Sequence, residues 1–187
     1  MKRSHHDALN HDRDHTVGRL DAASEGLLLF TNDTKWADSL LKTKDERRKT
    51  KDAIRSKVTE HAEVPRIGNE PLAFPHTKIY RVQVNGHTTA EDLRKMEKGF
   101  NVPPRVFGEK EEFMHAVRAV FHRESEKNCW LEITLDEGKN REIRRMLAHL
   151  GYEVLRLVRI KFCNYELGNL KQGEIKEIRP NSEQTTV

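Results

Sequence analysis

One acidic residue lies where a reactive group could be both fixed and exposed. Asp21 follows Gly18 and Arg19 and precedes the apolar run at 27–30. A buried strand holds such a side chain while the loop beside it leaves the group accessible, which suits a nucleophile. Asp21 could instead cap the next turn, because short acidic side chains hydrogen-bond their own backbone in turns. Its position alone leaves both roles open.

A second segment, from Glu137 to Met146, begins the region where positive charge concentrates. Residues 139–161 hold two glutamates and seven basic residues, namely Lys139, Arg141, Arg144, Arg145, Arg156, Arg159 and Lys161. Helical spacing places apolar side chains on one face, so the three arginines of this segment cannot all point the same way. One of them could turn toward a buried carboxylate while others reach phosphates. A DNA-recognition helix or a solvated helix would fit this segment equally well.

Residue patterns predict the elements that must hold these two segments. Apolar runs and alternation bounded by turn residues predict strands at 27–30, 78–86, 113–121, 129–135 and 154–162. Capping residues predict helices after Asp33 or Thr34, from Thr88 or Thr89 to about Gly99, and over 141–150. This order predicts an α+β fold with a mostly antiparallel mixed sheet flanked by helices.

Composition narrows the class of protein. The 187 residues are 35% hydrophobic and 34% charged, with a net charge of +4, which suits one modest core and long solvated segments. Cys129 and Cys163 lie in no CxxC pair, so we expect no metal site and interpret both as free thiols of a reducing, intracellular compartment. No apolar run approaches the length of a membrane span, and we expect no membrane partner.

Three segments in order resemble the motifs of one enzyme family. GRLDAASEGLLLFTND, at 18–33, resembles the catalytic motif of RsuA-like pseudouridine synthases. KIYRVQV, at 78–84, resembles that family's tyrosine strand. EGKNREIRRMLAHLGYEVLRLVRI, at 137–160, resembles its C-terminal catalytic motif, and LGNLKQGEIKEI fits its closing segment. The ordered set is far more specific than any one motif, and it implies the family's catalytic fold.

The resemblance implies a role for each matched residue. Asp21 would be the essential aspartate, which attacks the ribose of a target uridine or removes a ribose proton. The base would then rotate and rejoin the ribose through its carbon 5. Tyr80 would stack on the flipped base and assist the final deprotonation. Arg144 would pair with Asp21 and aim it, and the family needs no cofactor or metal.

The resemblance and the basic charge also imply an RNA-binding rim. Arg19 would displace the target base and occupy its place, or contact a phosphate, and Leu157 would line the base pocket. The other expected RNA contacts are Lys139, Asn140, Arg141, Arg145 and Arg159. We therefore expect a monomer that binds RNA, with ribosomal RNA as its substrate, in the cytoplasm or in an organelle with its own ribosomes.

Composition divides the chain at places that depart from the family pattern. Residues 1–15 predict a disordered leader, 16–180 the catalytic domain and 181–187 a polar tail. The family's small RNA-binding domain is not found, and its usual first strand is expected to be missing before Thr16. A charged insertion at about 42–74 predicts a solvated helix or an RNA-contacting arm. A non-catalytic relative that binds RNA in ribosome structure or assembly therefore stays open, whereas a DNA-binding regulator explains only the segment 141–150.

Overall fold

The computed structural model describes residues 14–41, 66–67, 70–71, 76–106, 108 and 110–178. The predicted leader up to residue 13, the insertion from 42 to 65 and the tail at 181–187 lie outside the described residues. Within the described ranges, no helix is both long and apolar enough to cross a membrane.

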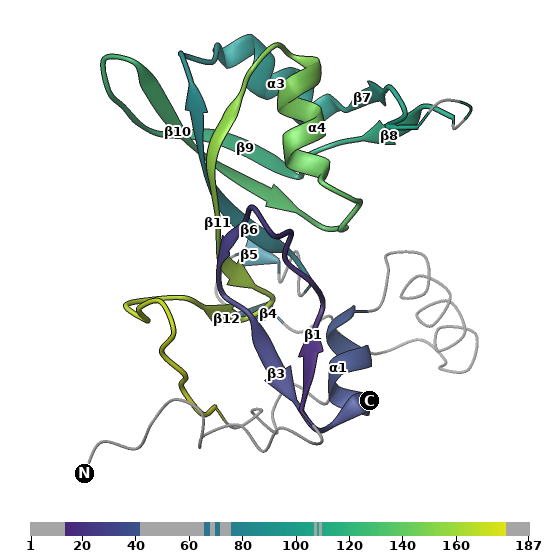
Figure 1. Ribbon diagram of the computed structural model, residues 1–187, viewed down its shortest axis with the longest axis vertical. Helices are drawn as coiled ribbons and strands as arrows, with labels where there is room; N and C mark the ends of the chain where they lie inside the picture. Colours follow the sequence, from purple (N-terminus) through teal and green to yellow (C-terminus); the bar gives the residue numbers. More distant parts are fainter. Residues whose placement is uncertain are drawn as a thin grey trace.

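A mostly antiparallel sheet runs through the centre of the structure (Figure 1). Its main path follows the order β12 (Tyr165–Glu166), β11 (Val154–Phe162), β6 (Lys78–Asn85), β10 (Asn128–Leu135) and β9 (Arg118–Glu124). One more strand, β2 (Glu25–Gly26), pairs with β11 in parallel. The predicted α+β fold with a mixed, mostly antiparallel sheet is therefore confirmed.

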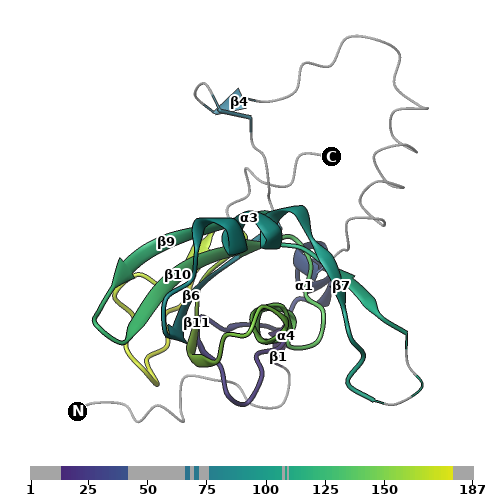
Figure 2. The same cartoon turned by 90° about the horizontal axis from the view of Figure 1, so that it is seen from above.

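One face of this sheet is covered by two helices. Alternate residues of β6 and β10, such as Val82 and Leu131, are buried, as the period of two in a strand requires. They form a single core with apolar side chains of α3 (Ala90–Lys98) and α4 (Glu142–His149). Figure 2, seen from above, shows both helices beside the curve of the sheet. This packing fixes which residues of the central strands face the helices.

Local signals set the helix ends and one strand break. The predicted cap is present at α3, where the Thr89 side chain accepts from the backbone N–H of Asp92 in a capping box. The predicted strand at 113–121 is instead two strands, β8 (Glu112–Met114) and the start of β9. The break arises because β8 pairs with β7 (Phe100–Val102) whereas β9 pairs with β10.

A smaller core lies at the other end of β11. It joins β1 (His15–Val17), β3 (Leu29–Thr31) and α1 (Thr34–Leu41) to Phe162 at the end of β11. The apolar run predicted as one strand at 27–30 is divided, because the chain pairs first with β11 through β2 and then with β1 through β3. A short strand, β1, does precede the motif at 18–33, and it starts inside the predicted leader.

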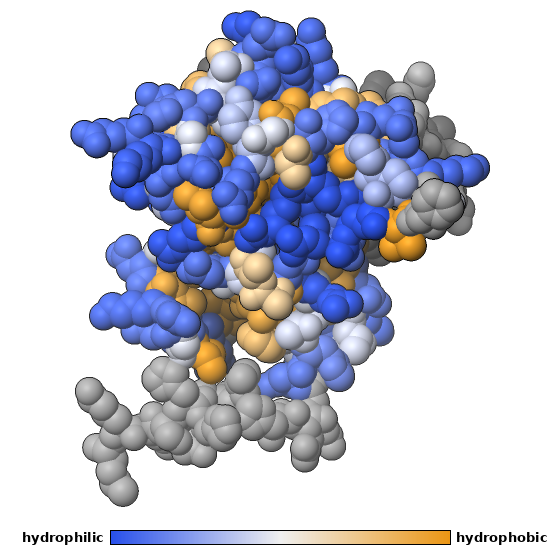
Figure 3. All heavy atoms as spheres, turned by 45° about the horizontal axis from the view of Figure 1, so that its top comes forward, coloured by the Kyte–Doolittle hydropathy of each residue, from blue (hydrophilic) through white to orange (hydrophobic). Residues whose placement is uncertain are grey.

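The rest of the described chain adds a short hairpin and a polar surface. β4 (Arg66–Ile67) pairs with β5 (Glu70–Pro71) within the predicted insertion. The face in Figure 3 is mainly hydrophilic, with apolar side chains in small patches. Exposed apolar side chains come from several elements, and they include Phe30, Val106, Phe113, Phe121 and Leu155. Scattered exposure of this kind is ordinary and marks no binding site by itself.

Candidate functional site

Asp21 lies in a loop that is tied to the main sheet just beyond it. The half-buried Asp21 accepts from the backbone N–H of Ser24 through its own carbonyl at 2.8 Å, which closes a turn. The chain then enters β2, where Gly26 lies opposite Arg159 of β11. Gly26 has a φ of +107°, and a Cβ added there would collide with the Arg159 carbonyl oxygen. Only glycine therefore lets the loop approach the strand so closely.

Tyr80 faces the helix-covered side of β6, packed against the main core. It lies opposite Ile133 on β10 and opposite Arg159 on β11. Burial raises the pKa of Tyr80 above its usual value; the Arg159 guanidinium opposes this rise, and the Glu142 and Asp21 carboxylates add to it. The phenol of Tyr80 therefore stays protonated at neutral pH.

Arg144 reaches the Asp21 loop from α4. Its Nη2 donates to the carbonyl of Ala23 at 2.6 Å, and its Nη1 donates to the carbonyl of Val154 at 3.1 Å. Burial lowers the pKa of Arg144, the neighbouring Arg141 lowers it further, and the Asp21 carboxylate acts in the opposite direction. The expected direct ion pair with Asp21 is absent from the described structure. Arg144 instead holds the loop backbone two residues beyond Asp21, because both of its terminal nitrogens bind carbonyl groups.

Arg159, predicted to contact RNA, is buried with 1% of its surface exposed. Its Nε donates to the carbonyl of Leu27 at 2.8 Å, and its Nη1 donates to the carbonyl of Arg19 at 3.3 Å. The guanidinium also lies over the Phe162 ring, 5.0 Å from its centroid. The prediction of an RNA contact is wrong here, because the register of β11 turns this side chain toward the covered face. Leu157, on the same face, is 5% exposed and belongs to the main core.

Three other predicted RNA contacts have partners within the protein. Lys139 donates through Nζ to the carbonyl of Phe113 at 2.6 Å and to the Glu137 carboxylate at 2.7 Å. Asn140 accepts from Arg105 at 2.9 Å. Arg145 forms an ion pair with Glu112 at 2.6 Å. These side chains join α4 and the loop before it to the neighbouring segments.

Arg19 and Arg141 are predicted RNA contacts whose side chains have no partner among the described residues. Arg19 is exposed and Arg141 is half-buried. Neither guanidinium has a hydrogen-bond or ion-pair partner in the part of the chain that the structure describes. Arg141 also has a left-handed backbone with φ of 50° at the start of α4, which is uncommon for an arginine.

Sequence reasoning missed a buried carboxylic acid in this group. Glu142 is 3% exposed, and its Oε2 accepts from the backbone N–H of Lys139 at 3.1 Å. Its Oε1 has no hydrogen-bond partner among the described residues. Burial, followed by the Glu137 carboxylate, raises the pKa of Glu142 to about 8. Its burial could have been predicted from its position, because Glu142 lies four residues before Met146 and therefore on the same, buried face of α4.

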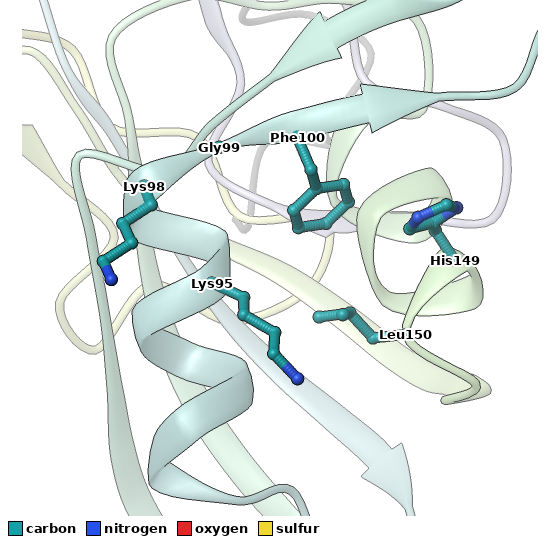
Figure 4. Close-up of a pocket in the computed structure, with 6 residues that line it drawn as sticks. All are labelled: Lys95, Lys98, Gly99, Phe100, His149 and Leu150. Carbon is teal, nitrogen blue, oxygen red and sulfur yellow. The ribbon is translucent and has the colours of Figure 1, made fainter.

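A hollow at the far end of the two helices lies apart from this group (Figure 4). Its volume is about 240 Å³, and it is lined by Lys95, Lys98, Gly99, Phe100, His149 and Leu150. The rings of Phe100 and His149 stack there, with centroids 5.0 Å apart. None of the predicted site residues lines this hollow.

Comparison with known proteins identifies the family. The model of a family described as RNA pseudouridylate synthase matches residues 2–149, which include Asp21, Tyr80 and Arg144. The chain belongs to this family. The resemblance to RsuA-like pseudouridine synthases is thus confirmed.

Curated relatives and a solved structure agree with the family model. The ribosomal large subunit pseudouridine synthase E of Vibrio parahaemolyticus is 33% identical, over 88% of this chain and 60% of its own length. The ribosomal large subunit pseudouridine synthase B of Bacillus subtilis is 28% identical, over 90% of this chain and 55% of its own. A crystal structure of a pseudouridylate synthase shares the fold, with a TM-score of 0.61 and 21% identity over 91% of this chain and 60% of the other. The chain thus spans somewhat more than half the length of these relatives.

Proposed function

We propose that this chain isomerises a specific uridine of ribosomal RNA to pseudouridine, acting as a monomer. The observation that carries the proposal is the meeting of Asp21, Tyr80 and Arg144 from three separate segments. Arg144 binds the carbonyl of Ala23, two residues beyond Asp21. Arg159, which lies opposite Tyr80, binds the carbonyl of Arg19, two residues before Asp21. Family membership supplies the reaction class, and the names of relatives that act on the large ribosomal subunit suggest the substrate.

The chemistry starts from the Asp21 carboxylate. It either bonds to the ribose carbon that carries the base or removes a neighbouring ribose proton, and in both routes the bond from ribose to nitrogen breaks. The freed uracil turns, and its carbon 5 bonds to the ribose while the bond from Asp21 to the ribose breaks or, in the other route, the ribose proton returns. The proton on carbon 5 then leaves, and the freed ring nitrogen takes up a proton. The reaction is an isomerisation, so no atom is gained or lost overall. Tyr80 would offer its ring as the platform for the base that has left the RNA stack.

In this proposal, Arg19 and Arg141 bind phosphates of the RNA. Arg19 lies two residues before Asp21, and Arg141 lies at the start of α4. Neither guanidinium group has a partner among the described residues. Each phosphate contact releases counterions from the RNA, so losing one arginine weakens binding and flattens its salt dependence. A double variant of Arg19→Gln and Arg141→Gln should therefore bind RNA more weakly than the wild type, with the largest loss at low salt and a shallower salt dependence.

One rescue experiment tests the enzymatic proposal. Pseudouridines would be mapped in ribosomal RNA from cells that lack the protein, then from cells rescued with the wild type, Asp21→Asn or Asp38→Asn. Asp38 is an exposed residue of α1 and provides the matched control. We expect one site to disappear in the deletion and to return with the wild type and Asp38→Asn, but not with Asp21→Asn.

Two outcomes would contradict this function. Full restoration of the site by Asp21→Asn would remove the aspartate from catalysis. A deletion strain with every pseudouridine intact and a defect in ribosome assembly would instead favour the non-catalytic RNA-binding alternative. The presence of Asp21, Tyr80 and Arg144 in the matched motifs favours the enzyme over that alternative, because RNA binding alone gains nothing from a carboxylate.

A further inference from the structure

We propose that Arg159 is a positioning residue that holds the Asp21 loop on the main sheet, a role that rests on the proposed function. The residue lies on β11, and its guanidinium donates to backbone carbonyls on both sides of Asp21. The carbonyl of Arg19 lies two residues before the aspartate, and that of Leu27 lies six residues after it. One side chain thus fastens both ends of the segment that carries the nucleophile.

The backbone of Arg159 adds a third contact to the same loop. The N–H of Leu27 donates to the Arg159 carbonyl at 2.8 Å, in addition to the two bonds made by the side chain. Arg159 is 1% exposed, so its bonds to the loop carbonyls are shielded from water in the folded protein. A displaced loop would leave a buried charge with unsatisfied donors, which is a costly state. The loop is therefore held in one place in the folded protein.

The same guanidinium also affects Tyr80. Tyr80 and Arg159 are opposite residues of neighbouring antiparallel strands, and the positive charge opposes the rise that burial causes in the pKa of Tyr80. Side chains at such opposed positions lie close together. Arg159 therefore links the proposed base platform to the loop of Asp21. It touches neither RNA nor the reacting atoms, so its effect on catalysis passes through these two residues.

Lysine cannot take over this arrangement. A guanidinium is a planar fork whose separate N–H groups can reach two carbonyls at once, whereas an ammonium is a single compact charge. Arg159→Lys keeps the charge but loses the span between the carbonyls of Arg19 and Leu27. This variant tests the geometry of the contact without removing the positive charge beside Tyr80.

Arg156 offers a matched control on the same strand. It also binds the loop, through two hydrogen bonds of 2.9 and 2.8 Å to the Glu25 carboxylate. However, its side chain is 52% exposed and its partner is 53% exposed. Exposed ion pairs contribute little, so Arg156→Met removes an arginine from β11 with little expected effect on the loop.

The test compares the wild-type chain with Arg159→Lys, Arg159→Met and Arg156→Met on an RNA fragment that contains the target uridine. The readouts are the single-turnover rate, the RNA dissociation constant at several salt concentrations, and amide hydrogen exchange of residues 20–27. We expect Arg159→Lys to slow the single-turnover rate by about 10- to 100-fold, because small misplacements of reacting groups have effects of that size. Its RNA affinity should stay within about 2-fold, and the Leu27 amide should exchange faster. Arg156→Met should change each readout by less than about 2-fold.

Several outcomes would overturn the proposal. Arg159→Lys with the wild-type rate and wild-type exchange at Leu27 would show that the contacts do not position the loop. In Arg159→Met, a weaker RNA affinity with a salt slope reduced by about one would make Arg159 a phosphate contact instead. If Arg159→Met does not fold, Arg159→Lys decides alone. If the wild type makes no pseudouridine, the proposed function fails, whereas the exchange of Leu27 in Arg159→Lys still decides whether the loop is held.

Discussion

Tyr80 and Arg159 lie directly opposite each other on β6 and β11, and Tyr80 packs against the core that α3 and α4 cover. Arg159 also binds backbone carbonyls of the loop that carries Asp21. Two neighbouring strands thus fix the positions of both proposed groups. Tyr80, the proposed platform for the base, lies on β6, and the loop of Asp21 is bound by Arg159 of β11. Sites built on rigid elements hold their geometry better than sites built on loops alone.

Arg144→Met should lower pseudouridine formation by at least about 100-fold, because the loop beyond Asp21 loses its anchor on α4. The melting temperature should fall by about 2–8 °C, since the carbonyls of Ala23 and Val154 lose a charged donor. Single-turnover assays and thermal unfolding measure the two effects. Arg94→Met, at an exposed position of α3, is the control. An unchanged rate of pseudouridine formation in Arg144→Met would show that Arg144 has no part in catalysis.

Tyr80→Phe should bind RNA within about 2-fold of the wild type, because the ring face remains, whereas Tyr80→Ala should bind about 5- to 100-fold more weakly. Burial raises the pKa of Tyr80, so its hydroxyl stays protonated well above neutral pH. Rate profiles of the wild type and Tyr80→Phe should therefore run parallel from about pH 6 to 9. A wild-type rate that climbs toward pH 9 and is flat in Tyr80→Phe would instead indicate a phenolate base.

Glu142→Gln should stabilise the protein at alkaline pH. The pKa of Glu142 is raised to about 8 by burial and then by Glu137, whereas the amide N–H of Lys139 opposes the rise. The folded state thus binds this proton more tightly than the unfolded chain, and the wild type loses stability as pH rises from about 4.5 to about 8. Melting temperatures at about pH 5 and pH 8.5 should show a gain for Glu142→Gln only at the higher pH.

Glu126→Gln provides the control for that titration, because Glu126 is exposed in the turn before β10. It should shift the melting temperature little at either pH. An equal shift in Glu142→Gln at both pH values would mean that Glu142 does not carry the pH dependence.

Gly26→Ala should disrupt the junction between β2 and β11. A methyl group would collide with the Arg159 carbonyl, and the φ of +107° is strained for any other residue. Gly86→Ala separates the two effects, because Gly86 has a φ of +79° but no atom within 4 Å of an added Cβ. We expect a larger fall in melting temperature and in pseudouridine formation for Gly26→Ala. Equal losses in the two variants would attribute the effect to backbone conformation alone.

Much of the fold could be predicted from the sequence, and the sequence also supplied a candidate catalytic set. The alternation in 78–86 and 129–135 predicted β6 and β10, and the capping residues predicted α3 with its Thr89 cap. Periods of two and 3.6 are local properties, so a single segment reveals them. The ordered motifs predicted the family, which the comparisons confirm, and they named Asp21, Tyr80 and Arg144 as a catalytic set that stays a prediction.

The roles of Arg159 and Glu142 were decided only by the tertiary structure. Arg159 has the same residue type and spacing as a phosphate contact, but its register against Tyr80 and its pairing with Gly26 bury it under the Asp21 loop. Its partner Leu27 lies 132 residues away in the chain. Whether a charged side chain faces solvent or a covered surface depends on which distant segments pack against its strand. The sequence named the candidate reactive residues, and the packing of distant segments decided which arginine binds the backbone of the Asp21 loop.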